Sequence, residues 1–243
     1  MSERFKRQLD IVKAGDLRFP VHILGAGGIG SWVALTLAKT GCSNITVYDN
    51  DKVEEHNVAS QFYKEDQLGE YKVKALAKNI FEQTGMEINI MKNVKEEELI
   101  YGGLVIITID SMAERIRLGE IYKDRRIFII DGRMGGLSFE LHAYKANKYL
   151  LSTVEPGKVD RDACTSKSIS FNCLVIAGII GNMVRKYAKD INQGKPSMYV
   201  DLNSLIVIRK DHSKREIKAD TAPSVASVGT LEASVSSEEP LPF

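Results

Sequence analysis

A glycine-rich segment between a strand pattern and a helix pattern restricts the fold of this chain more than any other feature. Residues 25–30 read Gly-Ala-Gly-Gly-Ile-Gly and directly follow the apolar run 21–24. Next, Ile29, Val33 and Leu37 recur at four-residue spacing, as one face of a helix does. Glycines in a strand–turn–helix let backbone N–H groups approach a phosphate at the helix N-terminus. The segment therefore predicts a site for a nucleotide phosphate; the alternative is a tight turn that binds no ligand. The glycines of the segment are Gly25, Gly27, Gly28 and Gly30.

Apolar runs and helical patterns then alternate along the chain. Strands are predicted at residues 45–48, near 88, at 104–109 and at 127–130, and helices at 71–84 and 113–123. The run 104–109 consists largely of β-branched residues, which is typical of a strand covered on both faces of a parallel sheet. Strand, helix and strand in this order indicate a doubly wound sheet.

The pattern changes after residue 137. Residues 138–144 alternate apolar and polar side chains, and residues 149–152 are predicted to pair with them as an antiparallel strand. An apolar helix at 169–188 and two closing strands at 198–202 and 205–209 complete the predicted elements. The predicted fold class is α/β: a doubly wound, Rossmann-like, mostly parallel sheet with antiparallel C-terminal strands.

Composition narrows the class of protein. With 44% hydrophobic and 27% charged residues, the 243-residue chain has the composition of a soluble globular protein. The longest apolar stretch, 173–181, is shorter than the ~18 residues that a bilayer crossing requires, and no apolar signal segment follows the charged N-terminus. We therefore expect a cytoplasmic protein that does not associate with membranes. A net charge of +1 argues against general affinity for nucleic acid.

Three regions are predicted along the chain. Residues 1–17 form an N-terminal helical arm, residues 18–218 a nucleotide-binding domain, and residues 219–243 a disordered tail. The tail is rich in Ser and Pro and has no hydrophobic periodicity, so it cannot bury enough apolar surface to offset its ordering entropy. The three cysteines form no CxxC pair, which favours reduced thiols over disulfides.

Asp49 ends the second predicted strand 19 residues after Gly30, the usual place for a carboxylate that accepts hydrogen bonds from ribose hydroxyls. A more specific pattern surrounds it. The glycine segment continues as SWVALTLAKTG, and the second strand with the residues after it reads ITVYDNDKVEEHN. A Gln and a Gly-x-x-Lys follow. Asp110 precedes Arg115 by five residues, and Asp131-Gly132 follow the fifth strand. From about Arg4 to Arg209, the chain resembles the ThiF/MoeB/HesA family, relatives of ubiquitin-activating enzymes.

Members of that family join AMP to a carboxylate, commonly the C-terminus of a small ubiquitin-like or sulfur-carrier protein. The resemblance implies that residues 18–218 are an ATP-binding adenylation domain of a homodimer that uses ATP and Mg²⁺. Lys72 would contact the phosphates, Asp110 would bind Mg²⁺, and Arg7 would reach the neighbouring subunit's site. Cys164 stands where relatives carry a cysteine that accepts the activated acyl group or sulfur. The nucleotide-binding residues implied beside the glycines are Asp49, Asp51, Asn57, Gln61 and Lys72.

Each assignment has a simpler alternative. Lys72 lies among other lysines and also suits a solvated helix face. Asp110 also suits a cap of the helix that follows it. Arg7 also suits an exposed position on a terminal helix, and Cys164 a passive loop thiol.

Two features depart from the family's pattern. Where the family usually has Arg before the Gln, this chain has Ser60, so one phosphate-binding guanidinium is missing. Lys64 or Arg133 would replace it, and Arg133 fits better because it follows the fifth strand at the ligand end of the sheet. The second departure is the lack of a CxxC pair, which many members use for structural zinc. The scattered cysteines and histidines offer no four-ligand set, so we predict no zinc.

Four hypotheses on function follow. The leading one is ATP-dependent adenylation of the C-terminal carboxylate of a ubiquitin-like or sulfur-carrier protein or a peptide. An activity like that of tRNA threonylcarbamoyladenosine dehydratase, which the resemblance also covers, would add RNA as a partner. An NAD-dependent oxidoreductase would use the same glycine loop, but no His or Tyr proton relay is recognisable. A non-catalytic module that binds a ubiquitin-like partner is consistent with Ser60.

Overall fold

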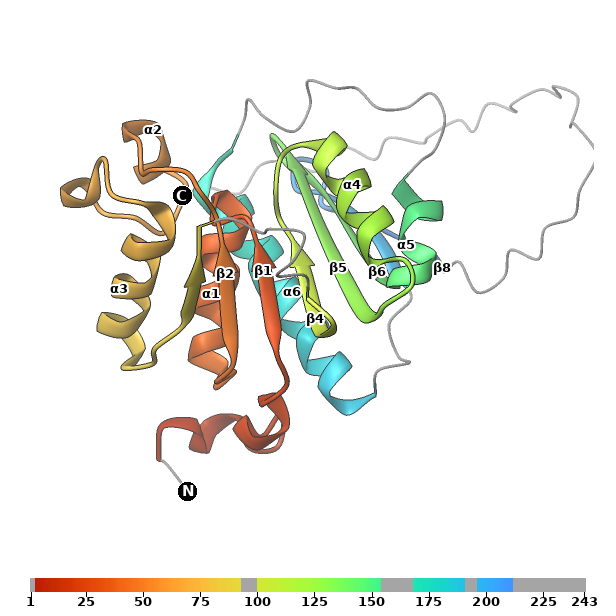
Figure 1. Cartoon of the computed structure of the whole chain (residues 1–243), viewed down its shortest axis with the longest axis horizontal. Helices are drawn as coiled ribbons and strands as arrows, with labels where there is room; N and C mark the ends of the chain where they lie inside the picture. The colour runs from red at the N-terminus through yellow and green to blue at the C-terminus, as the bar shows by residue number, and fades with distance from the viewer. Residues whose placement is uncertain (1–2, 93–99, 154–167, 191–195, 212–243) are drawn as a thin grey trace, which may run out of the picture. The chain divides into compact units, whose positions relative to one another are not determined.

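The computed structural model describes residues 3–92, 100–153, 168–190 and 196–211 (Figure 1). They contain an eight-stranded sheet with the order β3-β2-β1-β4-β5-β6-β7-β8. The parallel strands are β1 (Val21–Leu24), β2 (Ile45–Tyr48), β3 (Asn89–Met91), β4 (Gly102–Ile107) and β5 (Arg126–Gly135). The sheet continues in antiparallel fashion with β6 (Ser138–Lys145), β7 (Pro196–Asp201) and β8 (Ile206–Asp211). The predicted fold class is confirmed.

The strand order reverses at β1. From β1 the chain proceeds to β2 and β3 on one side, and the later strands β4 and β5 lie on the other side. Accordingly, Leu24 pairs with Tyr48 on one side and with Ile107 on the other. Connections that leave β1 and β4 in opposite directions open a crevice at the carboxyl ends of these strands, where open α/β sheets bind ligands. The glycine loop begins at Gly25, directly at this crevice.

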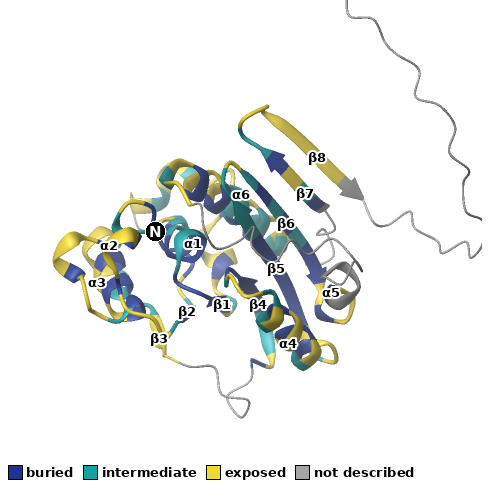
Figure 2. Ribbon diagram, turned by 90° about the horizontal axis from the view of Figure 1, so that it is seen from above, coloured by how far each residue is buried: buried dark blue, intermediate teal, exposed yellow. Residues whose placement is uncertain are grey.

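Helices cover both faces of the sheet. One face carries α1 (Gly28–Thr40), α3 (Lys72–Thr84) and α6 (Ser170–Lys189), and the other carries α4 (Met112–Tyr122) and α5 (Ala146–Thr153). Because successive side chains of a strand point to opposite faces, Ile23 packs in the first layer and Leu24 in the second. The central strands are therefore buried on both faces, whereas β8 at the edge is exposed (Figure 2).

The prediction of an antiparallel strand at residues 149–152 is wrong. These residues belong to α5, because β6 is paired with β5 on one edge and with β7 on the other and has no edge left for them. Tyr149 of α5 is fully buried in the core between the sheet and helices α4 and α5, and its hydroxyl donates to Asp131 at 3.0 Å. A short apolar run satisfies a buried helix face as well as a strand, and the neighbouring strands decide between them.

The N-terminal residues form two 3₁₀ turns, η1 (Glu3–Gln8) and η2 (Ala14–Leu17). The Gln8 side chain donates to the Thr40 carbonyl at the C-terminal end of α1, and Arg4 donates to the Thr84 carbonyl at the end of α3. These helix ends lie opposite the glycine loop (Figure 1). None of the described helices combines the length and the hydropathy that a bilayer crossing requires.

Candidate nucleotide-binding site

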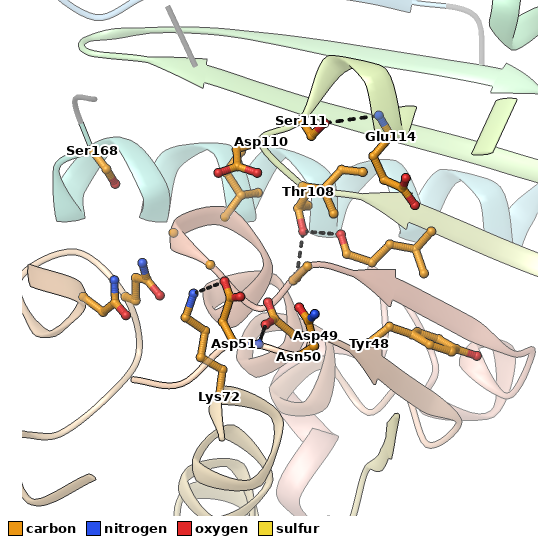
Figure 3. A pocket seen from close by; sticks show the side chains of 18 of the residues that line it. Tyr48, Asp49, Asn50, Asp51, Lys72, Thr108, Asp110, Ser111, Glu114 and Ser168 are labelled. Carbon is orange, nitrogen blue, oxygen red and sulfur yellow. Dashed lines mark hydrogen bonds and ion pairs between the residues drawn. The ribbon is translucent and has the colours of Figure 1, made fainter. Parts of the chain in front are cut away.

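A pocket of about 920 Å³ lies at the carboxyl ends of β1, β2 and β4 (Figure 3). This volume is in the range of small-molecule sites, roughly 300–1,000 Å³. The lining joins the glycine loop, the turn after β2, the start of α3 and the segment between β4 and α4. The lining residues that the sequence predicts are Gly25, Gly27, Gly28, Asp49, Asp51, Asn57, Gln61, Lys72 and Asp110.

Glycine occupies each of these loop positions for a different structural reason. Gly25 has a φ of 100°, and a Cβ there would lie 3.0 Å from the Thr108 carbonyl group. A Cβ at Gly30 would lie 1.9 Å from the Gly25 carbonyl oxygen, so α1 packs against the loop only because residue 30 is glycine. At Gly27, by contrast, the position of a Cβ has no described atom within 4 Å. Gly27 therefore leaves space beside the N-terminus of α1, where backbone N–H groups favour an anion.

Three side chains fix this loop from outside. The Asp49 Oδ2 atom accepts from the Ala26 N–H at 2.7 Å, and the Tyr63 hydroxyl donates to the Ala26 carbonyl at 2.7 Å. The Thr108 hydroxyl donates to the Gly25 carbonyl at 2.9 Å. Burial, together with the nearby carboxylates of Asp49 and Asp51, raises the pKa of Tyr63, so its phenol keeps the proton that it donates. The loop is thus held in place without a ligand.

Lys72 and Asp51 form an ion pair in the pocket. The Lys72 Nζ atom lies 3.0 Å from Asp51 Oδ2, and the Lys72 side chain is only 10% exposed whereas that of Asp51 is 63% exposed. The interpretation of Lys72 as part of a solvated helix face is therefore wrong. Asp49 Oδ1 accepts from the Asp51 N–H at 2.8 Å, so Asp49 connects the glycine loop to the turn that holds Lys72.

Asp110 is exposed and lines the pocket on the side opposite the Lys72–Asp51 pair (Figure 3). The cap of α4 is Ser111, whose hydroxyl accepts from the Glu114 N–H at 3.2 Å, so the interpretation of Asp110 as the cap is wrong. Within the described ranges, the Asp110 carboxylate has no hydrogen-bond or ion-pair partner. These ranges also hold no group of three or more His, Cys, Asp or Glu that could hold a metal alone. A single available carboxylate suits Mg²⁺, which in nucleotide sites uses one or two carboxylates, phosphates and water.

Asn57 and Gln61 line the pocket from α2 (Glu55–Val58) and the residues after it. The Asn57 Oδ1 atom accepts from the Glu54 N–H at 2.9 Å and is therefore used in the helix cap. The Gln61 Oε1 atom is buried and has no hydrogen-bond partner among the described residues. Leaving a buried acceptor unsatisfied costs about 1–3 kcal/mol, so a ligand that donates to Gln61 would recover this free energy.

A buried ion-pair network lies behind the pocket. Arg115 lines the pocket, is 2% exposed and pairs with the fully buried Asp131. Arg133 donates to the same carboxylate at 2.8 and 2.7 Å. Arg133, the expected replacement for the missing guanidinium, therefore faces Asp131 and is absent from the described lining of the pocket. Lys64, the other expected replacement, pairs with Glu82.

The comparison with protein families decides the classification of the chain. The ThiF family model matches residues 17–223. The chain belongs to the ThiF family. Ubiquitin-like modifier-activating enzyme 5 of Caenorhabditis elegans is 24% identical over 221 residues, which cover 76% of this chain and 51% of the relative. The adenylyltransferase and sulfurtransferase MOCS3 of Caenorhabditis briggsae is 37% identical over 75 residues, 30% of this chain and 19% of the relative.

Solved structures agree on the fold. Escherichia coli MccB with ATP has a TM-score of 0.71 at 15% identity, covering 87% of this chain and 72% of MccB. The structure of MccB with AMPCPP and selenomethionine MccA has a TM-score of 0.70 at 16% identity, covering 89% and 73%. The chain spans about half the length of the first-named curated relative. These TM-scores support the Rossmann-like fold, and at 15–16% identity the likeness extends to the fold alone.

Of two further residues implied by the family resemblance, one lies away from the pocket and the other is not described. Arg7 is exposed in η1, at the end of α1 opposite the glycine loop, so a role in a neighbouring subunit's site stays a prediction. Cys164 lies outside the described residues. Cys173 is buried in α6, and burial raises the pKa of its thiol, which fits the interpretation of Cys173 as a core residue.

Several residues that line the pocket or hold its glycine loop are not predicted from the sequence. Thr108 and Tyr63 hold the loop through single hydrogen bonds, and no local pattern marks such contacts. His56 and Lys92 both line the pocket. For Lys92 a signal exists, because it directly follows β3, and all parallel strands of the sheet end at the same edge.

Proposed function

We propose that this protein uses ATP and Mg²⁺ to adenylate the C-terminal carboxylate of a small ubiquitin-like or sulfur-carrier protein, or of a peptide. The observation that carries the proposal is the convergence of the open glycine loop, the buried Lys72 ammonium and the Asp110 carboxylate on one pocket at the strand-order reversal. Membership in the ThiF family supports it. The names of the relatives, a ubiquitin-like modifier-activating enzyme and an adenylyltransferase, support it further.

The chemistry explains why such a pocket needs positive groups. A carboxylate is a poor acyl donor because its leaving group would be oxide, and an acyl-adenylate replaces oxide by AMP. In the reaction a carboxylate oxygen bonds to the α-phosphorus, and the bond from that phosphorus to the bridging oxygen of pyrophosphate breaks. Both reactants are anions, so cations and N–H groups must lower their repulsion and stabilise the charge on the departing pyrophosphate.

The residues of the pocket divide this work. The loop N–H groups at Gly27 and the start of α1 would bind phosphate oxygens, and Lys72 would exchange Asp51 for a phosphate. Each carboxylate oxygen of Asp49 accepts one hydrogen bond from a backbone N–H group, and its remaining lone pair can accept from a ribose hydroxyl. Asp110 would hold Mg²⁺. When bound, this cation neutralises charge on the phosphates.

The test is intact-mass spectrometry of acceptor proteins. The protein is incubated with ATP, Mg²⁺ and candidate small proteins that end in Gly-Gly, and each acceptor is expected to gain the mass of one AMP. Asp110→Asn should abolish the gain. Asp124→Asn, which removes an exposed carboxylate outside the described pocket lining, should not. An Asp110→Asn variant as active as the parent would exclude the metal assignment, and no adduct on any carboxylate would exclude the reaction.

A further inference from the structure

Among the described residues that line the pocket, one cation is not paired with a carboxylate. Among the described residues that line it are five carboxylates and three permanent cations, so their net charge is −2 with histidine neutral. Two of the cations are already paired, Lys72 with Asp51 and Arg115 with Asp131. The third, Lys92, has no carboxylate partner within the described ranges. Among these described lining residues, Lys92 is therefore the cation that an incoming nucleoside triphosphate would contact without first separating it from a carboxylate.

The backbone of the sheet places Lys92 beside the nucleotide-binding turn. Met91, the last residue of β3, pairs in register with Tyr48, the last residue of β2. Its carbonyl accepts from the Asp49 N–H at 3.1 Å. Lys92 follows directly, is exposed and lines the pocket. Its position is thus determined by strand pairing and is tied to Asp49.

An aromatic ring holds the ammonium without neutralising it. The Lys92 Nζ atom lies 3.7 Å from the ring centroid of Tyr71, the residue before Lys72. A cation–π contact at an exposed site is weaker than a charge-assisted hydrogen bond to phosphate, so a bound phosphate would compete for the ammonium successfully. Lys52 also approaches this ring, at 5.5 Å, but it is absent from the described pocket lining. Lys52 is therefore a matched control for Lys92.

We propose that Lys92 binds the phosphate chain of the nucleotide and supplies the positive charge that Ser60 does not. The proposal rests on the proposed function for the identity of the ligand as ATP. Ser60 lines the pocket and is buried; its carbonyl accepts a hydrogen bond from Trp32 Nε1, and its short side chain carries no charge. Removing one charge-assisted contact to phosphate should weaken ATP binding about tenfold to a hundredfold.

The test is calorimetric titration of the full chain with ATP, AMP and adenosine in the presence of Mg²⁺. Lys92→Met keeps the chain length and the apolar contact with Tyr71 but removes the charge. It should weaken ATP binding by the factor given above, weaken AMP binding less, and leave adenosine binding unchanged. Lys52→Met should change none of the three, and Lys92→Arg should retain most of the ATP affinity. Melting temperatures recorded in parallel show that each variant is folded.

The outcomes separate this proposal from the adenylation reaction. Parental ATP affinity in Lys92→Met, or an equal loss for ATP and adenosine, would overturn the phosphate contact. ATP binding that depends on Lys92, in a protein that transfers no AMP, would support the contact and refute the transfer alone. A parent protein that binds no ATP would overturn both.

Discussion

Alanine substitutions at Gly30 and Gly27 should have opposite consequences, because one glycine is needed for packing and the other leaves space for a ligand. A Cβ at residue 30 would lie 1.9 Å from the Gly25 carbonyl oxygen, and real Cβ contacts are essentially never below 3.0 Å. Helix α1 or the loop must therefore move by at least about 1.1 Å. Overpacking of this kind costs about 1–3 kcal/mol. A loss of about 2 kcal/mol lowers the melting temperature of a chain of this size by roughly 4–8 °C.

Gly27→Ala should leave the stability within about 0.5 kcal/mol of the parent, because its Cβ meets no described atom within 4 Å. It should weaken ATP binding, since the methyl group would fill space beside the helix N-terminus. Scanning calorimetry gives the melting temperatures and titration gives the affinities. A parental melting temperature in Gly30→Ala, or a parental ATP affinity in Gly27→Ala, would refute this division of roles.

Three further predictions follow from single residues. Arg115→Leu should destabilise the fold by about 1–3 kcal/mol in urea unfolding, because it removes one partner of the fully buried Asp131, which keeps Arg133 and Tyr149; unchanged stability would contradict the network. Asp110→Asn should keep the parental melting temperature but lose the Mg²⁺ dependence of ATP affinity, and a retained dependence would place the cation elsewhere. Burial lowers the pKa of His142, so the unfolded chain takes up this proton at a higher pH than the folded chain. The stability should therefore fall as the pH drops below the ordinary pKa of 6.5, and His142→Gln should flatten that fall. An equal fall of the melting temperature with pH in the parent and in His142→Gln would exclude His142 as its source.

The parallel part of the fold could be predicted from the sequence because its signals are local. The predicted strands at 21–24 and 45–48 coincide with β1 and β2, since each is an apolar run bounded by turns. The assignment of residues 149–152 to a strand failed because the free edges of a sheet depend on strands distant in sequence. The pairing of β6 with β7, which leaves residues 149–152 no free edge, is visible only in the three-dimensional structure.

The site was predictable where residues follow strand ends. Asp49 and Asp110 stand after β2 and β4, and the parallel order brings both to one edge of the sheet. Sequence could not show that Arg133 faces Asp131, because the partner of a charge is determined by packing. Nor could it show that Tyr63 bonds to the glycine loop, a contact between residues 37 positions apart.

The central claim is that this pocket converts a C-terminal carboxylate into a mixed anhydride with AMP. Isotope exchange tests it most directly: the protein is given ATP, Mg²⁺, labelled pyrophosphate and a small protein or peptide with a free C-terminus. The account predicts that label enters ATP with the free carboxylate, and that it does not enter with the C-terminally amidated form of the same acceptor or with Asp110→Asn. Label that never enters ATP with any acceptor, or that enters equally with the amidated form, would contradict the account.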